Sequence, residues 1–259
     1  MSAGAVGVEA LDDAIARVTI SRPKKLNAMT EAMYRDLAQT FDTLNADPNL
    51  RCIILRGAGR RAFCVGSDIG EFLETLGKPE AQRRAARQGR EALDSLGRCP
   101  HPLIAEVRGA CFGGGLQIAS LCDLVVCAPD ARFGIPIKSL GLCAEIADLA
   151  AMVRRLGDGV TSDLLLTGRT LSADEAFAKG FVARLDEAPD KASLALAREI
   201  AEGAPLAARW HKRALAALSG AEAVTEDLRS QALTCFASAD FAEGCAAFAA
   251  KRRPVFQGR

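Results

Sequence analysis

Short apolar runs alternate with helix-like segments over most of the chain, and this alternation constrains the fold more than any other feature. Runs rich in Val, Ile and Leu predict buried strands at 15–20, 52–55, 103–107 and 124–127. Amphipathic spacing predicts helices at 30–44, with Thr30 as N-cap, and at 79–98, 113–121, 144–156 and 162–166. The chain after Pro189 is almost entirely helical in pattern. The order favours an α/β core over residues 1–190 and an all-helical region over residues 191–259.

Charge and cysteine usage exclude several classes of function. Lys and Arg number 33 and Asp and Glu 32, and this even balance argues against a dedicated nucleic-acid or anionic-membrane binder. No apolar run approaches the roughly 20 residues of a membrane helix. The 9 cysteines form no C-x-x-C pair and accompany 2 histidines, so we expect reduced thiols and no metal site. With no secretory-signal pattern at the N-terminus, a cytoplasmic location is expected.

Two glycine-containing loops carry the chemical signal. The first spans 63–69, and the second spans 113–119 at the point where a strand gives way to a helix. Glycine lets a ligand approach the backbone closely, and the first N–H groups of a helix have no internal partner. Such loops can bind an anion or a developing negative charge, although each loop alone could be an ordinary tight turn. Neither matches a phosphate P-loop or a dinucleotide-binding G-x-G-x-x-G motif.

Six segments in order share a family pattern: VTISRPKKLNAM at 18–29, FCVGSDI at 63–69, GGG at 113–115, CD at 122–123, FGIP at 133–136 and AFAAKRRPVF at 247–256. Together they resemble the enoyl-CoA hydratase/isomerase family, also called the crotonase superfamily. The resemblance implies a ββα spiral core that binds acyl-CoA and C-terminal helices that build trimers, often paired into hexamers. The implied substrate is an acyl-CoA thioester. Coenzyme A belongs to that substrate, so no separate cofactor is expected.

The resemblance also implies the site residues. The backbone N–H groups of Ser67 and Gly114 would hold the thioester oxygen, where negative charge develops when a neighbouring carbon loses a proton. Contacts with CoA are implied for Lys24, Lys25, Leu26, Ser67, Asp68, Ile69, Gly114, Phe248 and Lys251. The alternatives are a solvated turn for the two N-terminal lysines and an ordinary terminal amphipathic helix for the C-terminal pair.

The chain departs from the hydratase pattern at both catalytic glutamates. Gln117 occupies the first position and Ile137 the second. Glutamine does not take up a proton at useful pH, and isoleucine has no acid–base chemistry. Hydration of a double bond needs a base for the water and a proton source for carbon, so ordinary enoyl-CoA hydration is not expected.

One carboxylate remains at a position with family precedent. Glu145 matches an aspartate that moves protons in dienoyl-CoA isomerases and attacks carbon in 4-chlorobenzoyl-CoA dehalogenases. The leading hypothesis is an isomerase in which Glu145 transfers a proton, with Asp148 as a solvated partner. The alternatives are an acyl-CoA hydrolase or dehalogenase that uses Glu145, and a non-catalytic CoA-ester binding protein. Glu145 could also be favourable merely as an acidic residue at a helix start.

A face of four arginines on the predicted helix at 79–98 is also left open. The four side chains are Arg83, Arg84, Arg87 and Arg90. They could form a solvated surface, a wall for the phosphates of CoA or an RNA contact, and the net charge of +1 argues against RNA.

Overall fold

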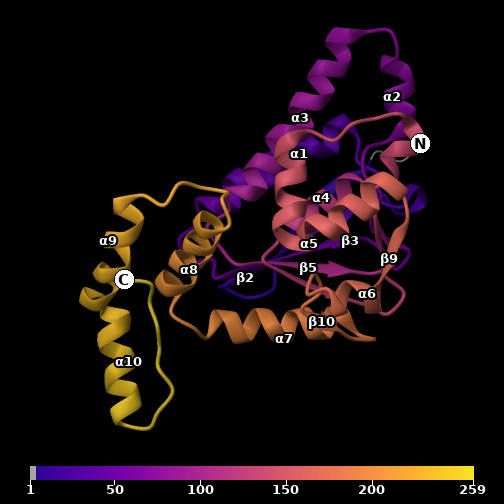
Figure 1. Ribbon diagram of the computed structural model, residues 1–259. Coiled ribbons are helices and arrows are strands. Elements are labelled where there is room, and N and C mark those ends of the chain that lie inside the picture. Colours follow the sequence, from indigo (N-terminus) through magenta and orange to yellow (C-terminus); the bar gives the residue numbers. More distant parts are fainter. Residues whose placement is uncertain (1–3) are drawn as a thin grey trace.

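The computed structural model describes residues 4–259 and contains two β-sheets surrounded by helices (Figure 1). The larger sheet contains β1 (Ala5–Ala10), β2 (Ile15–Ser21), β3 (Cys52–Gly57), β5 (Leu103–Val107), β7 (Leu124–Cys127) and β10 (Arg184–Leu185), in that order. Its neighbouring strands run parallel, except for the antiparallel pair β1 and β2. The smaller sheet contains β4 (Ala62–Cys64), β6 (Ala110–Phe112), β8 (Arg132–Gly134) and β9 (Thr170–Ser172), and only β8 and β9 pair antiparallel.

Three successive units of the chain each give one strand to each sheet and then a helical segment. The pairs are β3 and β4, β5 and β6, and β7 and β8. The helices that follow them are α2 (Ile69–Thr75) with α3 (Pro79–Gly97), α4 (Gly114–Leu121) and α5 (Ile146–Thr167). This repeated order confirms the predicted α/β class with a ββα spiral core.

The central strands of the larger sheet are buried on both faces, which explains their continuous apolar runs. On one face, Ile53 and Leu55 pack in the main core with residues of α1 (Glu31–Asn45) and α3. On the other face, Ile54 packs in a second cluster with Leu196 of α7 (Pro189–Ala201). Figure 1 shows α7 lying along the sheet on the side away from α1. Alternate side chains of the central strands therefore pack into two separate apolar layers, one on each face of the sheet.

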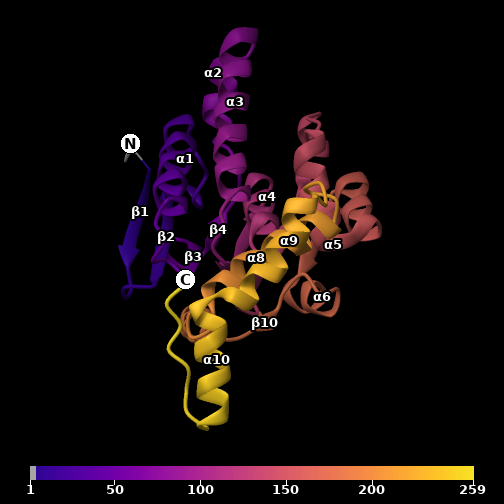
Figure 2. The ribbon, with the colours of Figure 1, turned by 90° about the vertical axis from the view of Figure 1, so that its left-hand side faces the viewer.

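The remaining C-terminal helices extend away from the sheets, as predicted for a helical region. They are α8 (Pro205–Leu218), α9 (Glu226–Thr234) and α10 (Ala239–Ala249), which follow α6 (Ala173–Ala178) and α7 in the chain. In both Figure 1 and Figure 2, α10 lies at the opposite end of the molecule from α2. On α8, Lys212 Nζ lies 2.7 Å from Asp123 Oδ2 and ties the helix to the core. The division at residues 190 and 191 remains a prediction.

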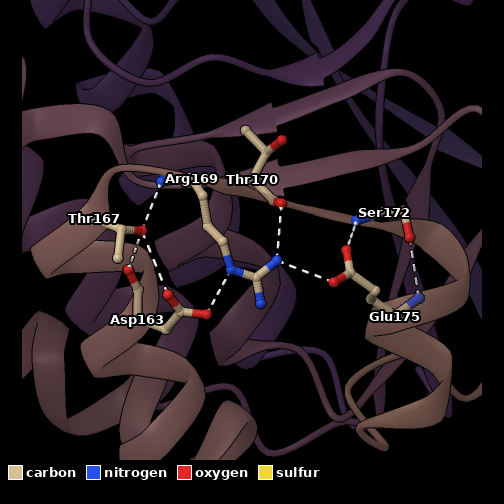
Figure 3. A network of polar contacts seen from close by, with 6 residues as sticks. All are labelled: Asp163, Thr167, Arg169, Thr170, Ser172 and Glu175. Carbon is tan, nitrogen blue, oxygen red and sulfur yellow. Dashed lines mark hydrogen bonds and ion pairs between the residues drawn. The ribbon is translucent and has the colours of Figure 1, made fainter.

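The structure joins the two helices predicted at 144–156 and 162–166 into one bent element. Gly157 interrupts the helical backbone of α5 with φ 78° and ψ 159°, a conformation open to glycine. At the end of α5, Arg169 donates to Asp163 at 2.5 Å and to Glu175 at 3.0 Å (Figure 3). Ser172 and Glu175 form a capping box at the start of α6, so these contacts fix the connection from α5 through β9 to α6.

Among residues 4–259, no helix combines the length and the apolar character needed to cross a membrane.

Candidate active site

A cavity of about 410 Å³ lies between the α2–α3 helices, the loops after β4 and β6, and the start of α5. Its lining includes the polar side chains of Tyr34, Ser67, Gln117 and Asp148 and the backbone of Gly114. Its apolar part is formed by side chains from α2, α3 and the segment before α5: Ile69, Phe72, Ala85, Ala86, Leu93, Ile137, Leu140 and Leu142. The cavity is therefore lined by both polar and apolar groups.

The two glycine loops meet because β4 and β6 are parallel neighbours, so the segments that follow them leave the same edge of the smaller sheet. Gly66 has φ +91° and Gly113 has φ +52°, both in the region that favours glycine. A Cβ atom on Gly66 would come 2.9 Å from the backbone nitrogen of Gly114. Glycine is thus required here both for backbone conformation and for the close approach of the loops.

The N–H groups of Ser67 and Gly114 donate to no acceptor within residues 4–259, and both residues line the cavity. Gly114 is the first residue of α4, where an N–H has no intrahelical acceptor. The backbone on either side of Ser67 is fixed, because Met29 N–H donates to Gly66 at 2.8 Å and Asp68 N–H donates to Met29 at 2.8 Å. Two unpaired donors are therefore held on anchored backbone.

Asp68 stabilises the start of α2 rather than facing solvent freely. Its carboxylate accepts hydrogen bonds from the N–H groups of Gly70 and Glu71 and pairs with Arg22. Burial acts to raise the pKa of Asp68, but the hydrogen bonds from Arg22 and Gly70 outweigh it and hold that pKa below its ordinary value. Asp68 thus remains ionised and links the turn at Arg22 to the cavity wall.

The predicted CoA contacts fall into three groups in this chain. Ser67, Asp68, Ile69 and Gly114 line the cavity. Lys24 and Lys25 are exposed in a 3-10 turn over Pro23–Lys25, and Leu26 follows it; all three lie outside the cavity lining. Phe248 is 88% exposed on α10 and Lys251 follows that helix, at the end of the molecule away from α2. Within one chain, therefore, the C-terminal pair does not reach the cavity.

Tyr34 is a site residue that the sequence prediction left without a role. Its hydroxyl lies 3.1 Å from Ser67 Oγ, and a Cβ atom on Gly114 would come 2.7 Å from it. Burial raises the pKa of the Tyr34 phenol, with further contributions from Cys64 and Asp148, so the hydroxyl remains protonated. Tyr34 is the chain's single tyrosine, but its place on the apolar face of α1 resembles that of a core residue.

The two carboxylates at the start of α5 are arranged differently from the sequence prediction. Glu145, expected to be the working carboxylate, is 59% exposed, and its Oε2 lies 2.5 Å from Arg90 Nη2. Asp148, expected to be solvated, is only 12% exposed, and its Oδ1 lies 3.0 Å from the same Arg90 nitrogen. The prediction for Asp148 is therefore wrong, because Arg90 of α3 and Gln117 of α4 enclose it. Arg90 is likewise a cavity residue and not part of a solvated face.

Gln117 and Ile137 both line the cavity. Gln117 Nε2 donates to Asp148 Oδ2 at 3.1 Å, so the glutamine amide holds a carboxylate that comes from another helix. Burial raises the pKa of Asp148, Glu145 raises it further, and Arg90 lowers it, leaving the pKa above its ordinary value of 3.8. The site thus contains a carboxylate with an increased tendency to hold a proton.

This raised pKa predicts a pH-dependent stability difference between the wild type and Asp148→Asn. Between 3.8 and the raised value, the folded chain binds more protons at Asp148 than the unfolded chain does. The wild-type free energy of unfolding, relative to the variant, should therefore fall as pH rises through that window. Urea unfolding between about pH 4 and pH 7 measures it, with Asp158→Asn on the exposed part of α5 as control. A constant difference would contradict the assignment.

Comparison with known proteins identifies the family. The model for the enoyl-CoA hydratase/isomerase family matches residues 10–259. The chain therefore belongs to the enoyl-CoA hydratase/isomerase family, which confirms the resemblance inferred from the motifs.

Individual relatives differ in the reaction that their names describe. A human mitochondrial Δ(3,5)-Δ(2,4)-dienoyl-CoA isomerase is 32% identical over 213 residues, which cover 76% of this chain and 64% of the isomerase. A carnitinyl-CoA dehydratase of Proteus mirabilis is 33% identical over 95% of both chains. The crystal structure of an enoyl-CoA hydratase/carnithine racemase from Magnetospirillum magneticum superposes with TM-score 0.92 at 40% identity, covering 98% of this chain and 96% of that one.

Proposed function

We propose that the protein is an acyl-CoA isomerase that moves a double bond by transferring a proton through an enolate. The observation that carries the proposal is the arrangement of the cavity. Two backbone donors without an acceptor among the described residues, the N–H groups of Ser67 and Gly114, lie in the same cavity as the carboxylates of Glu145 and Asp148. Removal of a proton beside a thioester places negative charge on its oxygen, and fixed N–H donors stabilise that charge as it forms.

The residues at the two hydratase positions favour isomerisation over hydration. Gln117 and Ile137 provide no carboxylate, so the pair of acid–base groups that syn-hydration uses is missing from those positions. A single carboxylate suffices for isomerisation, since it can take a proton from one carbon and return it to another. Glu145 was predicted to do so, and both it and Asp148 are available at the start of α5.

The proposal includes CoA binding at the rim of the cavity and self-association. Lys24, Lys25 and Leu26 would contact the CoA nucleotide beside Asp68 and Ile69, while Phe248 and Lys251 would reach it from a neighbouring copy. Exposed apolar residues on the C-terminal helices support association as a trimer or a dimer of trimers: Leu215, Leu218, Leu233, Phe236 and Phe248. A monomer in sedimentation equilibrium would contradict this part.

The activity is tested by incubating the wild type with a 3-enoyl-CoA in deuterated water and analysing the products by mass spectrometry. We expect migration of the double bond with deuterium in the acyl chain, because a carboxylate exchanges its proton with solvent. Crotonyl-CoA serves as the substrate for comparison. Rapid hydration of crotonyl-CoA would overturn the proposal, as would release of free CoA without isomerisation, which indicates a hydrolase.

A further inference from the structure

The Asp148 carboxylate is buried much more deeply than that of Glu145, the other carboxylate at the start of α5. Its Oδ2 accepts the hydrogen bond from Gln117, whereas its Oδ1 is buried and accepts no well-directed hydrogen bond within residues 4–259. Arg90 Nη2 lies 3.0 Å from Oδ1 but contributes an ion pair without hydrogen-bond geometry. A buried carboxylate oxygen of this kind retains the capacity to bind a proton or a polarised C–H group.

Gln117 relates this carboxylate to the donor pair. It lies one helical turn after Gly114, so its side chain is on the same end of α4 as the Gly114 N–H. The Gln117 amide donates to Asp148 Oδ2. The Asp148 carboxylate therefore lies one hydrogen bond away from the end of the Gln117 side chain. The geometry points to Asp148 as the group that transfers the proton, with Gln117 as its positioning residue.

Glu145 has a different role in this arrangement. Its Oε2 accepts from both Nε and Nη2 of Arg90, at 3.2 and 2.5 Å, and more than half of the side chain is exposed. Two nitrogens of Arg90 donate to the exposed Glu145, whereas the buried Asp148 Oδ1 forms only an ion pair with Arg90. Glu145 therefore holds Arg90 in place, and Arg90 compensates the charge of Asp148.

The proton transfer balances without another reactant, and this inference rests on the proposed isomerase function. The Asp148 carboxylate takes a proton from C2 of a 3-enoyl-CoA, and the C–H electron pair delocalises over C2, C4 and the thioester oxygen. The protonated carboxyl then returns the proton to C4. The carbonyl re-forms, and the double bond lies between C2 and C3.

The test compares kcat and KM of the wild type with those of Asp148→Asn, Glu145→Gln and Asp148→Glu. Asp148→Asn should lower kcat by about 100- to 10,000-fold with little change in KM, because it removes the base but leaves the cavity shape. Glu145→Gln should lower kcat by less than about tenfold. Asp148→Glu should recover part of the loss, because it restores a carboxylate. Asp158→Asn makes the same chemical change at an exposed position of α5 and is the matched control.

A pH profile separates proton transfer from a structural role. The charged or titratable groups that face Asp148 are Arg90 and Asp94 on α3, Glu145 beside α5, and Tyr34 on α1. Removing the positive charge in Arg90→Met should move the acidic limb of kcat/KM to higher pH, because Arg90 favours the ionised carboxylate. A purely structural Asp148 would leave that limb in place.

The outcomes distinguish the two levels of the proposal. If the wild type does not isomerise 3-enoyl-CoA, the proposed function fails, and the role of Asp148 fails with it. If the wild type is active but a folded Asp148→Asn variant keeps its kcat, or Glu145→Gln causes the larger loss, only the assignment to Asp148 is overturned. Circular dichroism and urea unfolding establish that each variant is folded.

Discussion

Gly114→Pro should lower kcat/KM for a 3-enoyl-CoA by about 100- to 1,000-fold relative to Gly114→Ala, when both changes are made in a Tyr34→Phe background. Gly114 is the first residue of α4, a helix position that proline tolerates. Proline removes the N–H group that we propose binds the enolate oxygen, whereas alanine retains it. The Tyr34→Phe change makes room, because a Cβ atom at position 114 would come 2.7 Å from the tyrosine hydroxyl.

The measurement needs both turnover and binding. Steady-state kinetics gives kcat/KM, and calorimetric titration with a saturated acyl-CoA gives the affinity for a ligand that forms no enolate. We expect both variants to bind the saturated ligand with similar affinity, since the lost interaction strengthens only as charge develops. Equal kcat/KM values for the proline and alanine variants would refute a catalytic role for the Gly114 N–H.

Asn27→Ala should lower the free energy of unfolding by roughly 3 kcal/mol or more, because it leaves several buried polar groups without partners. The Asn27 side chain is fully buried, accepts from the N–H of Arg22 at 2.9 Å, and donates to the carbonyls of Ala58 and Ala62 at 3.0 and 2.8 Å. It therefore connects the turn before α1 to the β3–β4 connection. Its backbone also has φ +57°, which disfavours alanine.

Urea unfolding of Asn27→Ala and Asn27→Gly separates the two contributions. Both substitutions remove the three hydrogen bonds, but glycine adopts a positive φ without strain. We expect the glycine variant to be more stable than the alanine variant by about 1 kcal/mol. Asn49→Ala, which removes an asparagine side chain at an exposed position, is the control. A loss below about 1 kcal/mol for Asn27→Ala would show that the side chain does not hold this junction.

Local sequence patterns were sufficient to predict the central elements. Thr30 accepts from Met33 N–H at 3.2 Å, as an N-cap should, and α1 begins at the next residue. The four apolar runs became β2, β3, β5 and β7 with nearly the predicted limits. These strands are buried on both sides, so their apolar runs are long enough to recognise. The two glycine loops also lie together, because the strands before them are neighbours.

Elements and roles that depend on distant contacts could not be predicted in this way. β1 is an edge strand whose residues are mostly exposed, so it has no apolar signature and was not predicted. The burial of Asp148 depends on Arg90, which lies on another helix, and on Gln117 from a third. The position of Asp148 in the first turn of a predicted helix does not show which residues of other helices surround it. The same limit applies to Tyr34, because its contact with Ser67 forms only when α1 packs beside the loop after β4.

The pairing of β4 with β6 has a consequence for how this site can change during evolution. Parallel neighbouring strands are separated by about 4.8 Å, a distance fixed by main-chain hydrogen bonds rather than by side chains. The two segments that carry the Ser67 and Gly114 N–H groups both leave this fixed pair of strands. Side chains from α3, α4 and α5 can be exchanged around this fixed pair without disturbing it. A carboxylate can accordingly be lost from one helix and supplied by another while the two main-chain donors keep their geometry.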